Sequence, residues 1–321
     1  MKYMEKEKEI IIEENNSNDN IDTPKNIKKK KKSNDGINNN MKAQIWKFFP
    51  LFLLPTVLAF IIGFVWPFIW GIYLSFFRFK TIRFQTFNGI NNYILAVQDV
   101  DFWYSMGFTA LFALVSIVLI NVIAFAVAYA LTSKLKGSTI FRAIFFMPNL
   151  IGGIVLGYAW YFILDSAIKI LFESQLKLGT GFGFWGLIIL VCWQQIGYMM
   201  IIYIAGLQNV PNDYIEAAKV DGAGGWHILF KIIIPTVMPS ITICLFLSLT
   251  NSFKLFDQNL ALTGGEPFGK TELVALNIYK SFYQSATNMG VGQAKAVIFF
   301  IVVTGISLLQ LWLTRRNEVQ Q

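Results

Sequence analysis

Hydrophobic residues collect in six long runs along this chain, and polar stretches separate the runs. They lie at about residues 50–77, 108–131, 143–164, 184–206, 231–250 and 295–313. A helix that crosses about 30 Å of hydrocarbon needs roughly 20 apolar residues, and each run has a length of that order. The pattern predicts six transmembrane helices and hence an all-α membrane protein, with a transmembrane domain over residues 45–316.

The segments that flank this domain are polar. Residues 1–44 are rich in Lys, Glu, Asn and Ser and include the block Lys28 to Lys32, whereas residues 317–321 form a short C-terminal tail. Such a composition cannot bury enough apolar surface to fold, so we predict that residues 1–44 are a disordered cytoplasmic tail. The first apolar run is too long for the core of a cleavable signal peptide.

The lysine block also bears on topology. It could bind nucleic acid or anionic lipid, but we favour a cytoplasmic anchor and expect no nucleic-acid partner. Six crossings then return the C-terminus to the same side, where Arg315 and Arg316 follow the last run. Outside the tail the bias of Lys and Arg is weak. The sequence thus predicts a multi-pass protein of the cell membrane, inner or plasma, with both termini in the cytoplasm.

Composition excludes several kinds of chemistry. The chain is 55% hydrophobic and 14% charged, with a mean hydropathy of +0.52, and none of the six predicted cores holds an ionisable side chain away from its ends. Carriers driven by an ion gradient usually need such a group at mid-membrane. Because no Gly-x-x-x-x-Gly-Lys-Ser/Thr phosphate loop occurs, we expect a non-catalytic chain without a cofactor, whose energy comes from another polypeptide.

The residues that most often bind metals are also poorly placed. Cys192 and Cys244 fall inside predicted spans, where they serve as apolar filler. His227 has only loop carboxylates near it. We therefore expect no metal site.

The loop between the fourth and fifth runs has the character of a short helix. Residues 216–222 read Glu-Ala-Ala-Lys-Val-Asp-Gly, and residues 232–235 read Ile-Ile-Ile-Pro. We expect Asp213 to cap a helix from Tyr214 to about Val220, and Gly222 to end it in a left-handed conformation.

The same loop has two distinct faces. An apolar underside could come from Leu207, Val210 and Ile215, which leaves Glu216 free to pair with a cationic group on a partner. A membrane protein that keeps such a helix in water is offering it to another protein.

The spacing of this loop resembles the EAA signature of inner-membrane permease subunits of ABC importers, with Ile234 where that family usually has Leu. Two further segments resemble sugar-type permeases. Residues 87–93 are similar to their Phe-x-Gly-x-x-Asn-Tyr element. Residues 256–257 and 262–267 are similar to Phe-Asp and Leu-Thr-Gly-Gly-Gly-Pro, with Glu266 in place of the third Gly. The resemblance covers roughly residues 45–316 and is strongest to the maltose and glycerol-phosphate type.

This resemblance implies a type I ABC importer permease fold, in which the loop is a coupling helix that docks on a cytoplasmic ATPase. The residues that would carry the coupling are Glu216, Ala217, Ala218, Asp221, Gly222, Ile232 and Pro235. The implied partners are an ATPase dimer, a second permease, an extracellular or periplasmic solute-binding protein, a small-molecule sugar and membrane lipid. Three alternatives stay open: import of glycerol phosphate or a polyol phosphate, an ion-coupled secondary transporter, and a membrane scaffold that only recruits a partner.

A sugar in a helical pore needs hydroxyl-matching donors and acceptors together with aromatic faces. Gln194 and Tyr198 are four residues apart and share a helix face, whereas Gln195 faces elsewhere. A second polar stripe comprises Ser248, Asn251 and Ser252. These five residues are our candidates for the substrate pathway, although polar groups in spans also serve only to hydrogen-bond neighbouring helices. A phosphorylated substrate would favour cations, and Lys254 alone is adjacent, so we favour neutral sugars.

Prolines open two of the predicted spans. Pro148 begins the third, and Pro235 and Pro239 begin the fifth. A proline inside a span kinks the helix, which suits a protein that opens alternately to two sides. A proline tolerated in the first turn of a helix fits Pro235 about as well.

Overall fold

The computed structural model describes residues 49, 53–81, 84–133, 137–284 and 288–316. The predicted tails at 1–44 and 317–321, including the lysine block, lie outside these residues. The chain divides into two compact units, Met1–Ile69 and Trp70–Gln321, and each is described by itself.

The predicted spans are present among the described residues. Five helices are long and apolar enough to cross a membrane: Leu53–Leu74, which ends in α3 (Trp66–Leu74), α5 (Val100–Thr132), α7 (Gly153–Phe172), α8 (Thr180–Gln208) and α15 (Met289–Arg315). The sixth is broken, because the helical segments Gly225–Thr236 and α12 (Met238–Phe253) meet at an angle of 71°. This agrees with the six runs read from the sequence.

The third span was predicted at the wrong place. Residues 143–164 comprise the end of a separate helix α6 (Ser138–Phe146), a 3-10 turn at Met147–Leu150 and only the first part of α7. The chain is extended at Ile151 and Gly152, with ψ angles of 130° and 139°, so the apolar run of the sequence holds two helices rather than one. Pro148 therefore lies in the turn before the span and does not open it.

This shift overturns the expectation that no ionisable group lies inside a span. α7 contains Asp165, which is 6% exposed, and Lys169. The Lys169 Nζ lies 2.6 Å from Asp165 Oδ2, and the Leu176 amide donates to Asp165 Oδ1 at 2.9 Å. α15 contains Lys295, which is also buried and paired, with Asp99.

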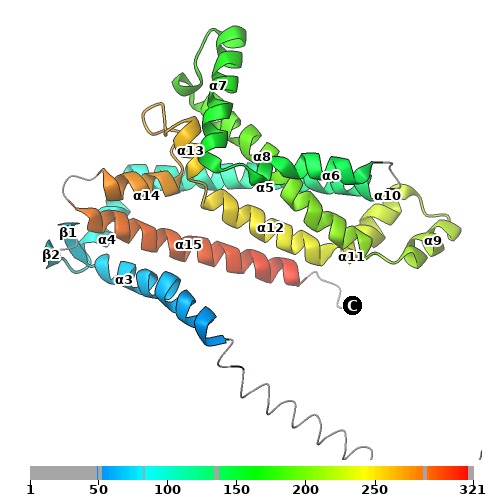
Figure 1. Ribbon diagram of the computed structural model, residues 1–321, viewed down its shortest axis with the longest axis horizontal. Helices are drawn as coiled ribbons and strands as arrows, with labels where there is room; N and C mark the ends of the chain where they lie inside the picture. The colour runs from blue at the N-terminus through cyan, green and yellow to red at the C-terminus, as the bar shows by residue number, and fades with distance from the viewer. Residues whose placement is uncertain (1–48, 50–52, 82–83, 134–136, 285–287, 317–321) are drawn as a thin grey trace, which may run out of the picture. The chain divides into compact units, whose positions relative to one another are not determined.

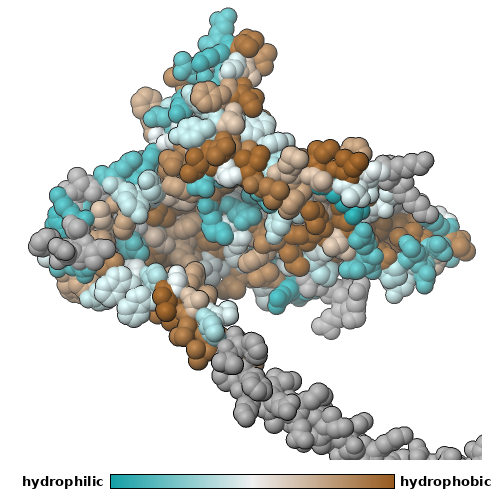
Figure 2. Space-filling model, in the orientation of Figure 1, coloured by the Kyte–Doolittle hydropathy of each residue, from teal (hydrophilic) through white to brown (hydrophobic). Residues whose placement is uncertain are grey.

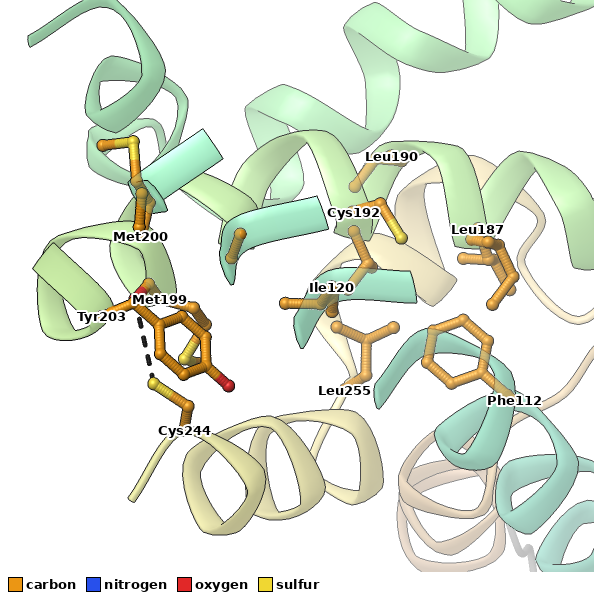
Figure 3. Packing of buried hydrophobic residues seen from close by; sticks show 14 of the residues in the cluster. Phe112, Ile120, Leu187, Leu190, Cys192, Met199, Met200, Tyr203, Cys244 and Leu255 are labelled. Carbon is orange, nitrogen blue, oxygen red and sulfur yellow. Dashed lines mark hydrogen bonds between the residues drawn. The ribbon is translucent and has the colours of Figure 1, made fainter. Parts of the chain in front are cut away.

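The main hydrophobic core joins α5, α8 and α12, which lie side by side in Figure 1. Figure 3 shows Phe112 of α5 beside Leu187 of α8, and Met199 and Tyr203 beside Cys244 of α12. In Figure 1, α7 leaves this bundle at a steep angle and packs against the short helix α13 (Asp257–Leu262).

Polar side chains inside this core link its three helices. The Tyr203 hydroxyl donates to Asn121 Oδ1 at 2.7 Å, and Asn121 Nδ2 donates to Ser248 Oγ at 3.0 Å. Nearby, the hydroxyls of Ser116 and Ser252 are 3.0 Å apart. Hydrogen bonds of this kind hold membrane helices together where hydrophobic attraction between helices is weak.

A small β-hairpin, which the sequence did not predict, follows the first span. It comprises β1 (Phe77–Thr81) and β2 (Phe84–Phe87), and it is followed by α4 (Asn91–Gln98). The fully buried Asn92 donates from Nδ2 to the carbonyls of Ser75 and Phe77 at 2.8 and 2.9 Å. Its Oδ1 accepts from Asn288 at the start of α15 at 2.8 Å. Through Asn92, the element at residues 87–93 therefore links the hairpin to the start of α15. α14 (Val274–Tyr283) also lies at this end of the bundle.

Candidate functional site

The helix predicted in the loop after α8 is present as α9 (Asn212–Val220). Its N-cap is Pro211, whose side chain makes no capping hydrogen bond, so the prediction that Asp213 caps the helix is wrong. Asp213 lies instead in the first turn, where the positive end of the helix dipole stabilises its carboxylate.

The C-terminus of α9 is closed as predicted. Gly222 has a φ of +80°, the left-handed conformation that glycine adopts without strain. The Ala223 amide donates to the Ala218 carbonyl at 2.9 Å, and the Gly222 amide donates to the Lys219 carbonyl at 3.1 Å. Together these bonds form the capping pattern that commonly ends helices at glycine. Asp221 occupies the C-cap and is exposed.

α9 presents one face to its own chain and another to solvent. Ile215 and Ala218 pack against the main core together with Leu207 and the buried Val210, which confirms the predicted underside. The outward residues include Tyr214, Glu216, Ala217, Lys219 and Val220, the last of which is 87% exposed. Figure 2 shows hydrophilic and hydrophobic residues exposed side by side over α9. The helix therefore offers a mixed outer face at the end of the bundle opposite the hairpin (Figure 1).

The bent span follows this loop directly. α10 (Gly225–Ile228) runs into a π-helix at Leu229–Ile233, and α11 (Ile234–Thr236) ends at Val237, where the 71° bend occurs. Ile232 packs on the main core, and its carbonyl accepts from the Thr236 hydroxyl at 2.6 Å. Pro235 lies in the first turn of α11 and Pro239 in that of α12. Both prolines thus lie in the first turn of a helix, and both lie next to the sharp bend of this span, so the two explanations given for Pro235 apply together.

The five pathway candidates divide into two groups. Ser248 and Ser252 are fully buried, and their hydroxyls are used in bonds to Asn121 and Ser116 of α5. Gln194 is also buried, and it accepts from Gln258 Nε2 at 2.8 Å. These three side chains are part of contacts within the chain.

Tyr198 and Asn251 are more accessible. Both are half-buried, and the Tyr198 hydroxyl has no hydrogen-bond partner among the residues that the structure describes. Asn251 Nδ2 donates to Gln195 Oε1 at 3.4 Å, so Gln195, which is as buried as Gln194, contacts α12 through its side chain. Among the candidates on α8 and α12, the side chains most accessible to a substrate are those of Tyr198 and Asn251.

The element at residues 262–267 forms an ordered turn after α13, beyond the C-terminal end of α12. The buried Asn259 supports it by donating to the Thr271 carbonyl at 2.8 Å and accepting from the Leu273 amide at 2.9 Å. Glu266 accepts from the Phe268 amide at 3.2 Å, so its carboxylate has a local role where the family usually has glycine. Sequence reasoning missed Asn259 and Asn121, although Asn121 is a lone amide in an otherwise apolar stretch.

Comparison with known proteins agrees with this architecture. Residues 136–319 match the family of binding-protein-dependent transport system inner membrane components. A probable starch degradation products transport system permease protein of Thermoanaerobacterium thermosulfurigenes is 43% identical, over 87% of this chain and 97% of its own length. A multiple sugar-binding transport system permease protein of Streptococcus mutans is 32% identical, over 84% and 95%.

A solved structure shares the fold. The bacterial alginate ABC transporter, determined in complex with an alginate pentasaccharide-bound periplasmic protein, contains a chain with a TM-score of 0.71 to this one. The match covers 85% of this chain and 96% of that chain, at 18% sequence identity. The family match, the permease relatives and this likeness of fold all coincide with the loop and spans described above. The chain therefore belongs to the binding-protein-dependent transport system inner membrane components, the permease subunits of ABC importers.

Proposed function

We propose that this permease forms half of a carbohydrate pathway, pairs with a second permease and takes its energy from cytoplasmic ATPase subunits through α9. The observation that carries the choice of substrate is the 43% identity, over nearly the whole length of both chains, to a permease named for starch degradation products. The second relative is named for multiple sugar binding. Neutral sugars, and oligosaccharides of glucose first among them, are the substrates that we infer.

The shape of α9 supports coupling to a separate ATPase. Its inner face is fixed to the core by Ile215 and Ala218, while Glu216, Ala217 and Val220 face outward. A surface that combines a carboxylate, a small side chain and an exposed apolar one suits a protein partner with a cationic rim. Because the ATPases are cytoplasmic, this proposal places α9 and both termini on the cytoplasmic side.

The contacts in the core favour a smaller sugar site than the sequence predicted. We infer that Tyr198 and Asn251 face the sugar, since they combine an aromatic ring with an amide that is not fully used, and that the buried Gln195 supports Asn251. Ser248 and Ser252 are better explained as links between α12 and α5. Gln194 would support the site from behind through Gln258.

A polyol phosphate is the second candidate substrate, and it has less support. A phosphate group is usually held by several cations or amide donors. On the described part of α12 and the residue after it, the exposed Lys254 is the one cation next to the amides. A single lysine at the end of a span would bind a phosphate weakly.

An ion-coupled carrier is disfavoured by how the charges inside the spans are used. Asp165 is held by Lys169 and by a backbone amide, and Lys295 is held by Asp99. A group that carries ions or protons must exchange partners during each cycle. The first pair lies within α7, with Asp165 also bonded to the turn after it, and the second ties α15 to the start of α5.

Transport by the reconstituted importer tests the proposal. Proteoliposomes that contain both permeases and the ATPases should take up maltotriose with ATP and with the solute-binding protein, and an ion gradient alone should not drive uptake. Glu216→Gln together with Gly222→Val should abolish uptake, while Glu173→Gln, an exposed acid outside the coupling loop, should not. Uptake driven by an ion gradient, or uptake of glycerol 3-phosphate but not maltotriose, would refute it.

The orientation can be tested separately. Both native cysteines are buried, so a cysteine placed at Glu216 should be the main reactive thiol among the described residues. A membrane-impermeant maleimide should label it in inside-out vesicles and not in intact cells. Labelling in intact cells would place α9 outside and overturn the coupling proposal.

A further inference from the structure

A cavity of about 850 Å³ with a mixed polar and apolar lining lies at the end of the bundle opposite α9. We call it the hairpin pocket, because β1 forms one side of it, and α4, α14 and α15 form the others. The residues used in the argument are Arg78, Asn91, Asp99, Lys280, Gln284 and Lys295. Figure 2 shows hydrophilic side chains gathered at this end, over the hairpin and α14.

Two of the three cations in the wall are already used. Lys295 Nζ lies 2.6 Å from Asp99 Oδ2 and also donates to Ser281 Oγ at 2.7 Å. Lys280 Nζ lies 2.6 Å from Glu272 Oε2 and donates to the Gly264 carbonyl at 2.9 Å. These two ion pairs make the floor of the pocket rigid and nearly neutral.

Arg78 is different. It is exposed on β1, whose neighbouring residue Phe79 is 3% exposed and points into the fold. The Arg78 guanidinium has no acidic partner in the part of the chain that the structure describes. The Arg78 backbone pairs with Thr86 of β2, whose hydroxyl donates to the Arg78 carbonyl. The hairpin pocket thus has a net positive rim with amide groups from Asn91 and Gln284 beside it.

We propose that the hairpin pocket receives an acidic side chain of the solute-binding protein, with Arg78 as the residue that pairs with it. The inference deepens and rests on the proposed function, which places this end of the bundle outside the cell. A free guanidinium fits a carboxylate in a two-bond geometry that a lysine cannot offer. The ion pairs of Lys280 and Lys295 leave Arg78 as the cation of the pocket that can pair with an incoming carboxylate.

The surroundings favour a protein over a sugar or a lipid. No aromatic ring is among the lining residues, whereas sugar sites usually offer one. Beside the pocket, Phe87 and Ile90 are 74% and 64% exposed at the turn that leads into α4. Exposed apolar side chains next to an unpaired arginine are the composition that protein interfaces favour.

Charge reversal at two positions of one strand tests the inference. Arg78→Glu should weaken binding of the solute-binding protein to the assembled importer by about tenfold or more, as expected when a pairing charge becomes repulsive. Lys80→Glu is the matched control, since Lys80 is exposed on the same strand but does not line the pocket. It should change the affinity by less than about threefold. The probe is the importer's own solute-binding protein, and its affinity is measured on importer in nanodiscs.

The outcomes separate the two proposals. Weaker binding for Arg78→Glu alone, with wild-type maltotriose uptake restored at saturating binding protein, supports the inference. Equal losses in both variants, or no loss in either, would overturn it while wild-type uptake still supports the proposed function. A loss of uptake at unchanged affinity would also overturn it and would point to a sugar or lipid in the pocket. If the wild-type importer neither binds the protein nor transports sugar, both proposals fail.

Discussion

The ion pair between Asp99 and Lys295 should reveal which of its two charges the fold depends on. The Lys295 side chain is 3% exposed, whereas the Asp99 side chain is 32% exposed. The lysine also donates to Asn277 Oδ1 at 3.1 Å and lies 5.5 Å from the centre of the Phe102 ring. The two partners of this ion pair are therefore buried to very different extents.

Removing the anion should cost more than removing the cation. Asp99→Asn leaves a buried ammonium without its counter-ion but with Asn277 and Ser281 still accepting, so we expect a loss of about 2–3 kcal/mol. Lys295→Met leaves a carboxylate that can turn to water, and methionine fills the space against Phe102. We expect a loss of about 1 kcal/mol or less for that change. The double variant should match Lys295→Met alone.

Thermal unfolding of the purified permease in detergent at pH 7 measures the difference. For a domain of this size about 1 kcal/mol corresponds to roughly 2 °C. Asp99→Asn should then lower Tm by about 4–6 °C and Lys295→Met by about 2 °C. Asp101→Asn, an exposed acid in the same turn, is the control and should leave Tm unchanged. The reasoning is refuted if Lys295→Met is the more destabilising change, or if the double variant is worse than both single ones.

Three further predictions follow from the geometry. Burial alone would raise the pKa of the Asp99 carboxyl, but its hydrogen bonds and lysine partner hold the pKa below 3.8. The ionised Asp99 therefore stabilises the folded protein, and this contribution is complete above pH 3.8. It disappears as the pH falls through the lower folded value, and an acid titration of Tm should show a loss in the wild type that Asp99→Asn lacks. Gly197→Ala should lower stability by about 3 kcal/mol or more, because its Cβ would lie 1.8 Å from the Phe145 carbonyl oxygen. Gly181→Ala, where nothing lies within 4 Å, should unfold at the wild-type temperature. Gly222→Ala should destabilise the end of α9 by about 1 kcal/mol through its φ of +80°, detected as faster amide hydrogen exchange there; unchanged exchange would contradict this.

The sequence was sufficient for the number of spans but not for all of their limits. Continuous apolar runs identify helices well, yet α6 and α7 are both apolar, and the extended residues at Ile151 and Gly152 between them carry little polar signal. The error of about ten residues concealed Asp165 and Lys169 inside a span. The hairpin was missed for a similar reason, since the alternating Phe77 and Phe79 directly follow an apolar run.

The candidate site also has features that the sequence could predict and others that it could not. The closing of α9 at Gly222 could be predicted because a left-handed residue has a clear chemical preference. The bonding of Ser248 to Asn121 could not, because it depends on which faces of α12 and α5 meet across a separation of 127 residues. Spacing within one helix shows which residues share a face but not what that face contacts.

The anchoring of α9 has a consequence for how force travels through the protein. Ile215 and Ala218 hold the helix on the core of its own chain, and the bonds around Gly222 close its far end. A loop tethered by slack peptide would absorb a partner's displacement locally. Because Ile215 and Ala218 anchor α9, the proposed ATPase, by pushing on its outer face, would move α8 or change the angle at Val237.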